Sequence, residues 1–139
     1  MNKLSILLVE DDEIDVMSFR RGMRKYGNDC PLVVAAHGEE ALRILRGTHP
    51  DKSIEPPLLI FIDVNMPVMS GAEFLRELRG DPALAATVVF MLSTSDHPVD
   101  RRAAYEQHIA GYILKQDLGD SCQNLHELIA LYRRIMLLP

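Results

Sequence analysis

Five short apolar runs, each separated from the next by a segment with helical spacing, are the feature that most constrains the fold of this chain. The runs lie at residues 4–9, 32–36, 58–62, 87–92 and 111–114. Parallel neighbouring strands need a long crossover, usually a helix, and that connection is right-handed. The run at 58–62 is apolar throughout, so it belongs at the centre of a sheet covered on both faces. The pattern predicts an α/β fold, a three-layer αβα sandwich around a parallel sheet.

Helical spacing or helix-start signals mark all five expected helices. Ser70 and Glu73 form a capping box that opens the third helix, and Pro98 suits the first turn of the fourth. The second helix is expected at residues 39–46. Apolar side chains three and four residues apart mark the other two helices: Val16, Phe19, Met23 and Tyr26 in the first, which closes at Gly27, and Leu125, Leu128, Ile129, Tyr132 and Ile135 in the last.

Polar residues capable of chemistry follow four of the five expected strands. In strand order, these residues are Glu10 and Asp11, Asp63, Ser93, and Lys115. In parallel sheets, ligands bind beyond the carboxyl ends of the strands. If these strand ends converge, three acids, a hydroxyl and an ammonium share one pocket.

Each of these residues taken alone has a simpler interpretation. An Asp directly after a strand is more often the N-cap of the next helix than a ligand, and Asp12 fits such a cap. A lone Lys after a strand is usually solvated. The coincidence at four strand ends favours one shared site over unrelated surface residues.

The donor set of this pocket predicts a hard divalent cation together with a phosphoryl group. Crowded carboxylates cost energy unless a cation joins them. Hard oxygen ligands suit Mg²⁺ or Mn²⁺ rather than zinc, and Mg²⁺ usually combines one or two carboxylates with water and phosphate. An Asp carboxylate can act as a nucleophile and form an acyl phosphate. Lys115 and Ser93 would then bind the phosphoryl oxygens.

Four motifs in order make the chain resemble the receiver domains of bacterial response regulators, from residue 6 to about residue 133. They are ILLVEDD at 6–12, FIDVNMPVMSG at 61–71, MLSTSD at 91–96 and GYILK at 111–115. The resemblance implies a flavodoxin-like receiver fold with five helices and strand order 2-1-3-4-5. It also implies a phosphorelay in which a histidine kinase donates the phosphoryl group.

The same resemblance implies roles for the acidic residues. Asp63 matches the phospho-acceptor, and Glu10 and Asp11 match the acidic pair. Asp11 would bind Mg²⁺ directly and Glu10 through water, while Asn65 would lend its backbone carbonyl to the metal.

The remaining matched residues belong to the family's switch. Ser93 matches the switch hydroxyl, Tyr112 the aromatic residue that swings inward on activation, and Lys115 the lysine that contacts the phosphoryl group. Family members usually have Pro after that lysine, often through a cis bond, whereas Gln116 follows here. A cis bond before a non-proline residue costs ~2.5–4 kcal/mol, so the geometry of the loop after Lys115 is left open.

Three features resemble the response regulators that partner phytochrome-type histidine kinases: the long loop at 48–57, the LSTSD segment and the missing proline. The residues after Lys115 suffice for one helix. We therefore expect a single receiver domain over residues 1–139, without an output domain, that signals by changing partners. A shuttle that exchanges phosphoryl groups with a histidine-phosphotransfer protein is the alternative.

Composition argues against several other classes of protein. A net charge of -5 lacks the surplus of Lys and Arg that non-specific nucleic-acid binding needs. No apolar run approaches the ~20 residues of a membrane-spanning helix. Cys30 and Cys122 are expected to be ordinary reduced thiols. These observations predict a cytoplasmic protein with neither a nucleic-acid nor a membrane partner.

Two competing functions fit less well. A phosphohydrolase with Asp63 as nucleophile needs a second Asp two residues on as general acid, and Asn65 stands there. A phosphorylation-independent binding module usually loses the acidic pair or the acceptor, and both are intact. The resemblance implies that the side chains at Asn65 and Ser95 tune the attack of water on the phosphorylated acceptor. Because Ser95 lacks a carboxylate or amide, we expect no enzyme activity beyond slow self-dephosphorylation.

Two surface features have open interpretations. The basic cluster Arg20, Arg21, Arg24 and Lys25 on the first helix is either a solvated face or a kinase docking surface. The apolar tail at residues 135–139 either forms a homodimer contact or packs on its own domain.

Overall fold

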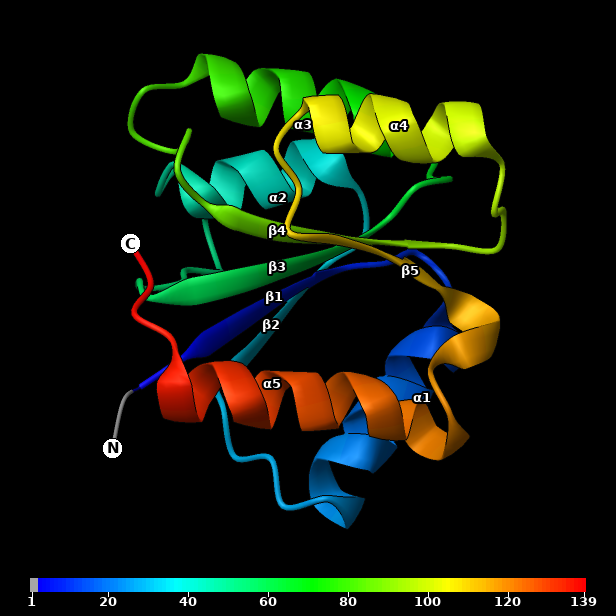
Figure 1. Ribbon diagram of the computed structural model, residues 1–139. Coiled ribbons are helices and arrows are strands. Elements are labelled where there is room, and N and C mark those ends of the chain that lie inside the picture. The colour runs from blue at the N-terminus through cyan, green and yellow to red at the C-terminus, as the bar shows by residue number, and fades with distance from the viewer. Residues whose placement is uncertain (1–2) are drawn as a thin grey trace.

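The computed structural model describes residues 3–139, in which a five-stranded parallel sheet lies between two layers of helices (Figure 1). The strands are β1 (Ser5–Val9), β2 (Leu32–Ala35), β3 (Leu58–Asp63), β4 (Val88–Ser93) and β5 (Gly111–Leu114). Their order across the sheet is β2-β1-β3-β4-β5, with every neighbouring pair parallel. The predicted fold class and strand order are confirmed.

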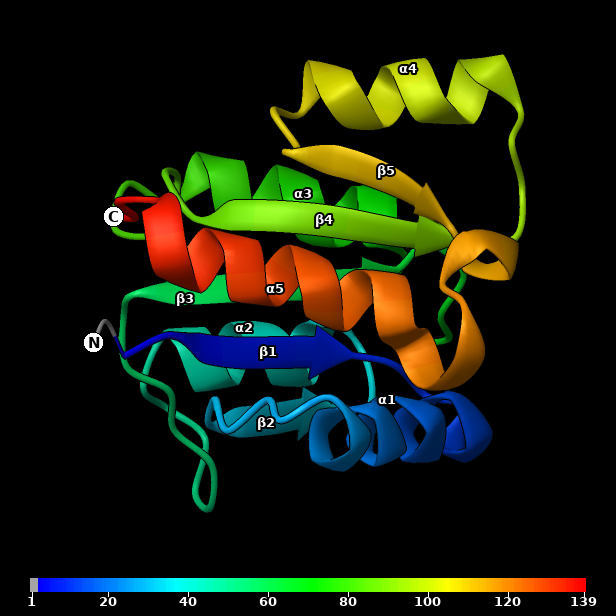
Figure 2. The same ribbon diagram turned by 60° about the horizontal axis from the view of Figure 1, so that its bottom comes forward.

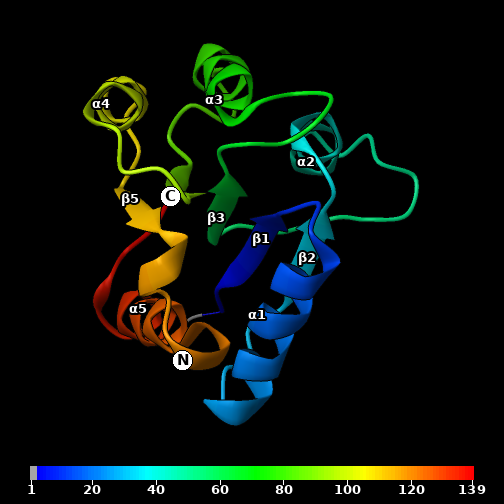
Figure 3. The ribbon, with the colours of Figure 1, turned by 90° about the vertical axis from the view of Figure 1, so that its right-hand side faces the viewer.

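The helices divide between the two faces of the sheet. They are α1 (Glu13–Lys25), α2 (Gly38–Leu45), α3 (Gly71–Gly80), α4 (Pro98–Glu106) and α5 (Gln123–Ile135). Helices α1 and α5 cover one face, and α2, α3 and α4 lie on the other (Figures 1 and 3). Two short 3-10 helices, η1 (Lys115–Asp117) and η2 (Asp120–Cys122), lie between β5 and α5; sequence reasoning did not predict them.

The predicted helix starts are confirmed by hydrogen bonds. The Asp12 side chain accepts from the backbone N–H groups of Ile14 and Asp15, so Asp12 caps α1. Ser70 and Glu73 form both bonds of the capping box at α3. An N-cap of this kind stabilises a helix by about 1 kcal/mol.

The core is divided by the sheet into two apolar clusters. Ile60 and Ile62 of β3 point to the α2–α3 side, whereas Leu59 and Phe61 point to the α1–α5 side, and all four have no exposed surface. Each such side chain stabilises the fold by roughly 1.5–3 kcal/mol. Strand β3 is therefore the buried centre of the sheet, as its unbroken apolar run predicted.

All five strands run in the same direction, so their carboxyl ends meet at one edge of the sheet (Figure 2). In the register, Val9 lies beside Ile62, and Asp63 lies beside Leu92. This alignment brings the polar residues that follow β1, β3, β4 and β5 to the same edge.

Three features away from the carboxyl edge of the sheet concern membrane spanning, the cysteines and the basic side chains of α1. Within residues 3–139, no helix combines the length and the apolar character that crossing a bilayer requires. Cys30 and Cys122 are buried free thiols, as expected. The basic side chains of α1 are exposed, and Lys25 pairs with Asp120 at 2.7 Å.

Candidate functional site

Three carboxylates gather at the carboxyl edge of the sheet. Glu10, Asp11 and Asp63 each offer an oxygen, and these oxygens lie within 4.8 Å of one another. Glu10 and Asp63 are buried, while Asp11 is exposed. The convergence expected from the strand ends is therefore present. Three hard oxygen donors fit Mg²⁺ or Mn²⁺, because these ions prefer carboxylates and water.

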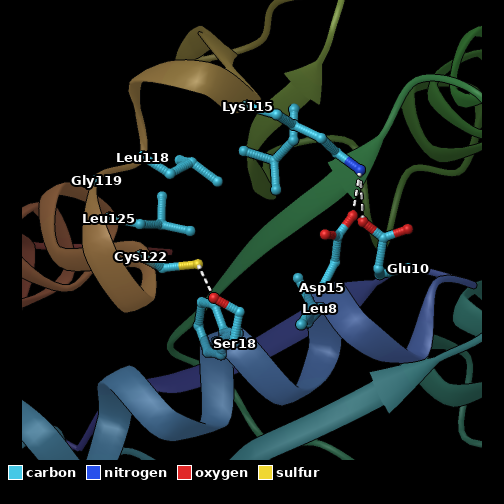
Figure 4. Close-up of a pocket in the computed structure, with 11 residues that line it drawn as sticks. Leu8, Glu10, Asp15, Ser18, Lys115, Leu118, Gly119, Cys122 and Leu125 are labelled. Carbon is cyan, nitrogen blue, oxygen red and sulfur yellow. Dashed lines mark hydrogen bonds and ion pairs between the residues drawn. The ribbon is translucent and has the colours of Figure 1, made fainter.

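Lys115 joins this cluster through all three of its N–H bonds. Its Nζ donates to Glu10 Oε1 at 2.8 Å, to Asp15 Oδ2 at 2.9 Å and to Asp63 Oδ2 at 3.0 Å. Figure 4 shows the ammonium pointing toward Glu10 and Asp15. Three carboxylates thus contact one ammonium, and Asp11 adds a fourth carboxylate beside Glu10 and Asp63, so the excess of negative charge favours a divalent cation.

Asp15 is the member of this site that sequence reasoning missed. It follows no strand but lies in the first turn of α1, three residues after the Asp12 cap. The signal that could have found it is an acidic residue in the first turn of a helix that begins directly beyond an acidic pair.

The pKa values of Glu10 and Lys115 respond to burial and to each other. Burial raises the pKa of Glu10 to about 7, against the lowering effect of the Lys115 hydrogen bond. For Lys115, burial lowers the pKa, but the hydrogen bonds to the three carboxylates outweigh it and the pKa is raised. Lys115 is therefore charged at neutral pH. A cation bound beside Glu10 would lower the pKa of that carboxyl.

The two oxygens of Asp63 have different partners. Oδ1 accepts a hydrogen bond from the backbone N–H of Asn65 at 3.1 Å, and Oδ2 accepts from Lys115. Asn65 therefore lies next to the Asp63 carboxylate, and its expected role as a metal ligand stays a prediction.

Ser93 and Tyr112 are linked to each other through Ser95. The Ser93 hydroxyl is fully buried and accepts from the backbone N–H of Ser95 at 3.0 Å, and the Tyr112 hydroxyl donates to the Ser95 carbonyl at 3.0 Å. Within the described residues, the Ser93 hydroxyl makes no hydrogen bond to Asp63 or Lys115. The two residues expected to form the switch are thus connected through the backbone of Ser95, and their switch role stays a prediction.

The departure at Gln116 leaves Lys115 in place. Among the described residues the Lys115–Gln116 bond is trans, and the chain continues into η1, where the Leu118 N–H donates to the Lys115 carbonyl. The lysine reaches the carboxylates without the proline that the family usually has.

A parallel sheet in this order, with clustered carboxylates and a paired lysine at its carboxyl edge, defines the class as a flavodoxin-like receiver module. The sequence pattern of the family "Response regulator receiver domain" matches residues 6–128. The chain therefore belongs to the response regulator receiver domain family of two-component signalling, as its motifs predicted.

Similarity to relatives extends over most of the chain. Response regulator Rcp1 of Synechocystis sp. is 32% identical over 110 residues, which cover 79% of this chain and 75% of that protein. The structure of Mn²⁺-bound Rcp1 has a TM-score of 0.83 at 29% identity and covers 99% of both chains. The phosphorylated cyanobacterial phytochrome response regulator RcpA has a TM-score of 0.84 at 28% identity, covering 100% of this chain and 99% of its own. The predicted similarity to phytochrome-associated response regulators is confirmed.

Proposed function

We propose that this protein is a single-domain response regulator that accepts a phosphoryl group from a histidine kinase on Asp63. The observation that supports this most directly is the Asp63 carboxylate, whose oxygen lies 3.0 Å from the Lys115 ammonium and within 4.8 Å of the oxygens of Glu10 and Asp11. Family membership points to the same function.

In the proposed reaction, an Asp63 oxygen forms a bond to phosphorus while the bond from phosphorus to the donor breaks. Asn65 orients one carboxylate oxygen by its backbone N–H, and Lys115 offers charge to the phosphoryl oxygens. Glu10, Asp11, Asp63 and the Asn65 carbonyl would hold Mg²⁺, or Mn²⁺ as in the Rcp1 structure. The ion, when bound, neutralises negative charge on the phosphoryl oxygens.

The test is the mass of the intact protein after incubation with acetyl phosphate, with and without Mg²⁺. Wild type is expected to gain one phosphoryl group only with Mg²⁺, and Asp63→Asn is expected to gain none. Asp51→Asn is a matched control, since Asp51 is an exposed acid in the loop after α2, and it should gain the group like wild type. A wild type that gains nothing under any condition would leave a phosphorylation-independent binding module.

The proposed donor is a sensor histidine kinase of the phytochrome type. RcpA is a cyanobacterial phytochrome response regulator, and its structure aligns with this whole chain. A phytochrome kinase should transfer its phosphoryl group to this protein faster than unrelated kinases do. Equal rates would contradict this assignment. If a histidine-phosphotransfer protein takes the group back, the protein acts as a shuttle.

The proposed output is a change of partner in the cytoplasm. Phosphorylation would draw the Ser93 hydroxyl toward the phosphoryl group and change the Tyr112–Ser95 contact, which shifts the equilibrium of the face formed by α4, β5 and α5. NMR spectra of that face should change on phosphorylation. The buried reduced thiols of Cys30 and Cys122 support a cytoplasmic location.

A homodimer through the C-terminal tail is part of the proposal. Leu138 packs against the core cluster on the α1–α5 side, while Leu137 is 96% exposed and available to a second copy. Light scattering should show a smaller particle when residues 135–139 are removed. An unchanged particle mass would favour a tail that packs on its own domain.

A further inference from the structure

We propose that Asp15 is a positioning residue for Lys115: it fixes the direction of the one Lys115 N–H bond that meets the phosphoryl group. The inference rests on the proposed function, because it concerns how Lys115 acts on phosphorylated Asp63. Asp15 contacts Lys115 at 2.9 Å, as closely as the residues of the strand ends do.

The Lys115 ammonium has three donors, and each has a carboxylate partner from a different segment. Glu10 follows β1, Asp15 belongs to α1, and Asp63 ends β3, at distances of 2.8, 2.9 and 3.0 Å respectively. An ammonium is tetrahedral with three N–H bonds. Two N–H bonds held by carboxylates therefore determine where the third one points.

Phosphorylation of Asp63 would change one of these three contacts. The new phosphoryl oxygens are strong acceptors close to the Lys115 ammonium. If Glu10 and Asp15 keep their contacts, the N–H bond that faced Asp63 is aimed at a phosphoryl oxygen. With Glu10 alone, the ammonium can rotate about a single hydrogen bond, and the third N–H bond has no fixed direction.

Lys115 lies at the edge of a cavity. Lys115 borders a cavity of about 140 Å³, which is also lined by Asp15, Ser18 and Cys122 (Figure 4). The Lys115 side chain is 17% exposed and that of Asp15 is 43% exposed, so Asp15 holds the ammonium from the solvent side. The three hydrogen bonds of the ammonium are directional, so they set where its N–H bonds point.

The start of α1 gives Asp15 the fixed position that this role needs. The Asp12 side chain accepts from the backbone N–H groups of Ile14 at 2.9 Å and of Asp15 at 3.4 Å. The backbone of Asp15 is thus tied to the cap directly beyond Glu10. A residue held on a rigid helix end can orient a lysine from another element.

The first measurement is the rate of phosphorylation by acetyl phosphate at saturating Mg²⁺. In this reaction an Asp63 oxygen bonds to phosphorus, and acetate leaves with the electron pair of the broken P–O bond. Asp15→Ala is expected to lower the maximal rate roughly tenfold, the scale of a misoriented catalytic contact, with little change in half-saturating concentration. Asp15→Asn keeps an oxygen acceptor, and its rate should fall between those of wild type and Asp15→Ala.

Glu13→Ala is the matched control for loss of charge at the helix start. Glu13 lies in the same first turn of α1 and is exposed, so this variant removes the same charge without touching Lys115. Its rate is expected to stay within about twofold of wild type, since the lost charge interacts with the helix N-terminus, and the ion-pair partners of Lys115 are other residues. Equal slowing in Asp15→Ala and Glu13→Ala would overturn the positioning role.

The second measurement is the ¹⁵N NMR signal of the Lys115 ammonium, recorded without a phosphoryl donor. Three hydrogen bonds slow proton exchange, so the signal should be sharp in wild type and in Glu13→Ala and broadened in Asp15→Ala. An unchanged signal and rate in Asp15→Ala would overturn the inference while the proposed function stands. A wild type that takes up no phosphoryl group would instead overturn the proposed function, and this inference with it.

Discussion

Helices α1 and α5 are held together by polar contacts of a buried side chain, whereas α4 in the opposite layer is attached mainly at its C-terminal end. Between α1 and α5, the buried His126 ring contacts the Phe19 carbonyl through Nε2 at 2.9 Å and Asn28 through Nδ1 at 3.0 Å. The ring also packs on the Phe19 ring, with centroids 4.6 Å apart. Lys25 adds an exposed ion pair to the segment that leads into α5.

Helix α4 has a different kind of attachment. Ala104 is its one buried residue. At its C-terminal end, the Arg79 guanidinium of α3 donates to the carbonyls of Gln107 at 2.8 Å and His108 at 2.9 Å. At its N-terminal end, the exposed His97 side chain supplies the cap. Fewer buried contacts mean a lower free energy of local opening for α4.

Under the proposed function, this difference would separate the site of phosphoryl transfer from the helix that signals. The α1–α5 layer carries Asp15 and is connected through η1 and η2 to Lys115, so it would hold the proposed phosphorylation site in a fixed geometry. Helix α4 follows the β4–α4 connection, where the Tyr112 hydroxyl donates to the Ser95 carbonyl. Under the proposed function, a change at the site would move α4 about its Arg79 anchor, while the buried contact between α5 and α1 at His126 stays in place.

The largest effect on stability is expected from His126→Ala in the α1–α5 layer. This change removes a buried ring, its two hydrogen bonds and its contact with Phe19, and it should lower the free energy of unfolding by about 3 kcal/mol. Urea unfolding followed by circular dichroism measures the loss. Leu131→Ala, a partly exposed position on the same helix, should cost well under half as much. Similar losses in both variants would mean that the His126 contacts contribute no more to stability than a partly exposed side chain of α5 does.

The corresponding test of α4 is Arg79→Met, which keeps the apolar stem but removes the donors to the α4 end. The guanidinium also bonds the carbonyls of Ala85 and Thr87. Water can replace some of these bonds at this half-buried position, so the expected loss is about 2 kcal/mol. Hydrogen exchange should speed up in α4 and leave α1 and α5 unchanged. Faster exchange in all helices alike would contradict an anchor specific to α4.

Much of the fold could be predicted from the sequence, since local rules determine it. The unbroken apolar run of β3, the cap at Asp12 and the capping box at Ser70 each depend on neighbouring residues, and all are confirmed. The convergence of Glu10, Asp63 and Lys115 followed from parallel strands alone.

Contacts between distant segments could not be predicted in this way. His126 carried no ligand spacing, and its role depends on the Phe19 carbonyl, 107 residues away. Asp15 and Lys115 are 100 residues apart in the sequence, and their contact depends on how α1 is placed relative to the end of β5. The geometry after Lys115 was also left open by the sequence; the chain forms the 3-10 helices η1 and η2 there, with left-handed backbone at Ser121 and Cys122.

A smaller effect is expected from Tyr112→Phe, which removes only the hydroxyl that donates to the Ser95 carbonyl. A single hydrogen bond of this kind contributes about 1 kcal/mol. The amides of residues 94–97 should exchange faster, while Asp63 should be phosphorylated at the wild-type rate. Tyr105→Phe is a matched control on α4, since its hydroxyl accepts from the Tyr112 N–H instead. If slowed phosphorylation accompanies Tyr112→Phe, the separation of chemistry from signal fails.

The smallest expected effect is a pH dependence of stability from His126. Burial lowers the pKa of His126 from its ordinary value of 6.5, with the hydrogen bond to Phe19 opposing the shift. The unfolded chain therefore binds a proton below pH 6.5 that the folded protein does not bind, so the free energy of unfolding falls as pH decreases. One group can change it by at most about 1 kcal/mol between pH 6.5 and 5.5. Urea midpoints across this range should fall less steeply in His126→Gln than in wild type. If the urea midpoints of both proteins fall equally with pH, the acid sensitivity belongs to a group other than His126.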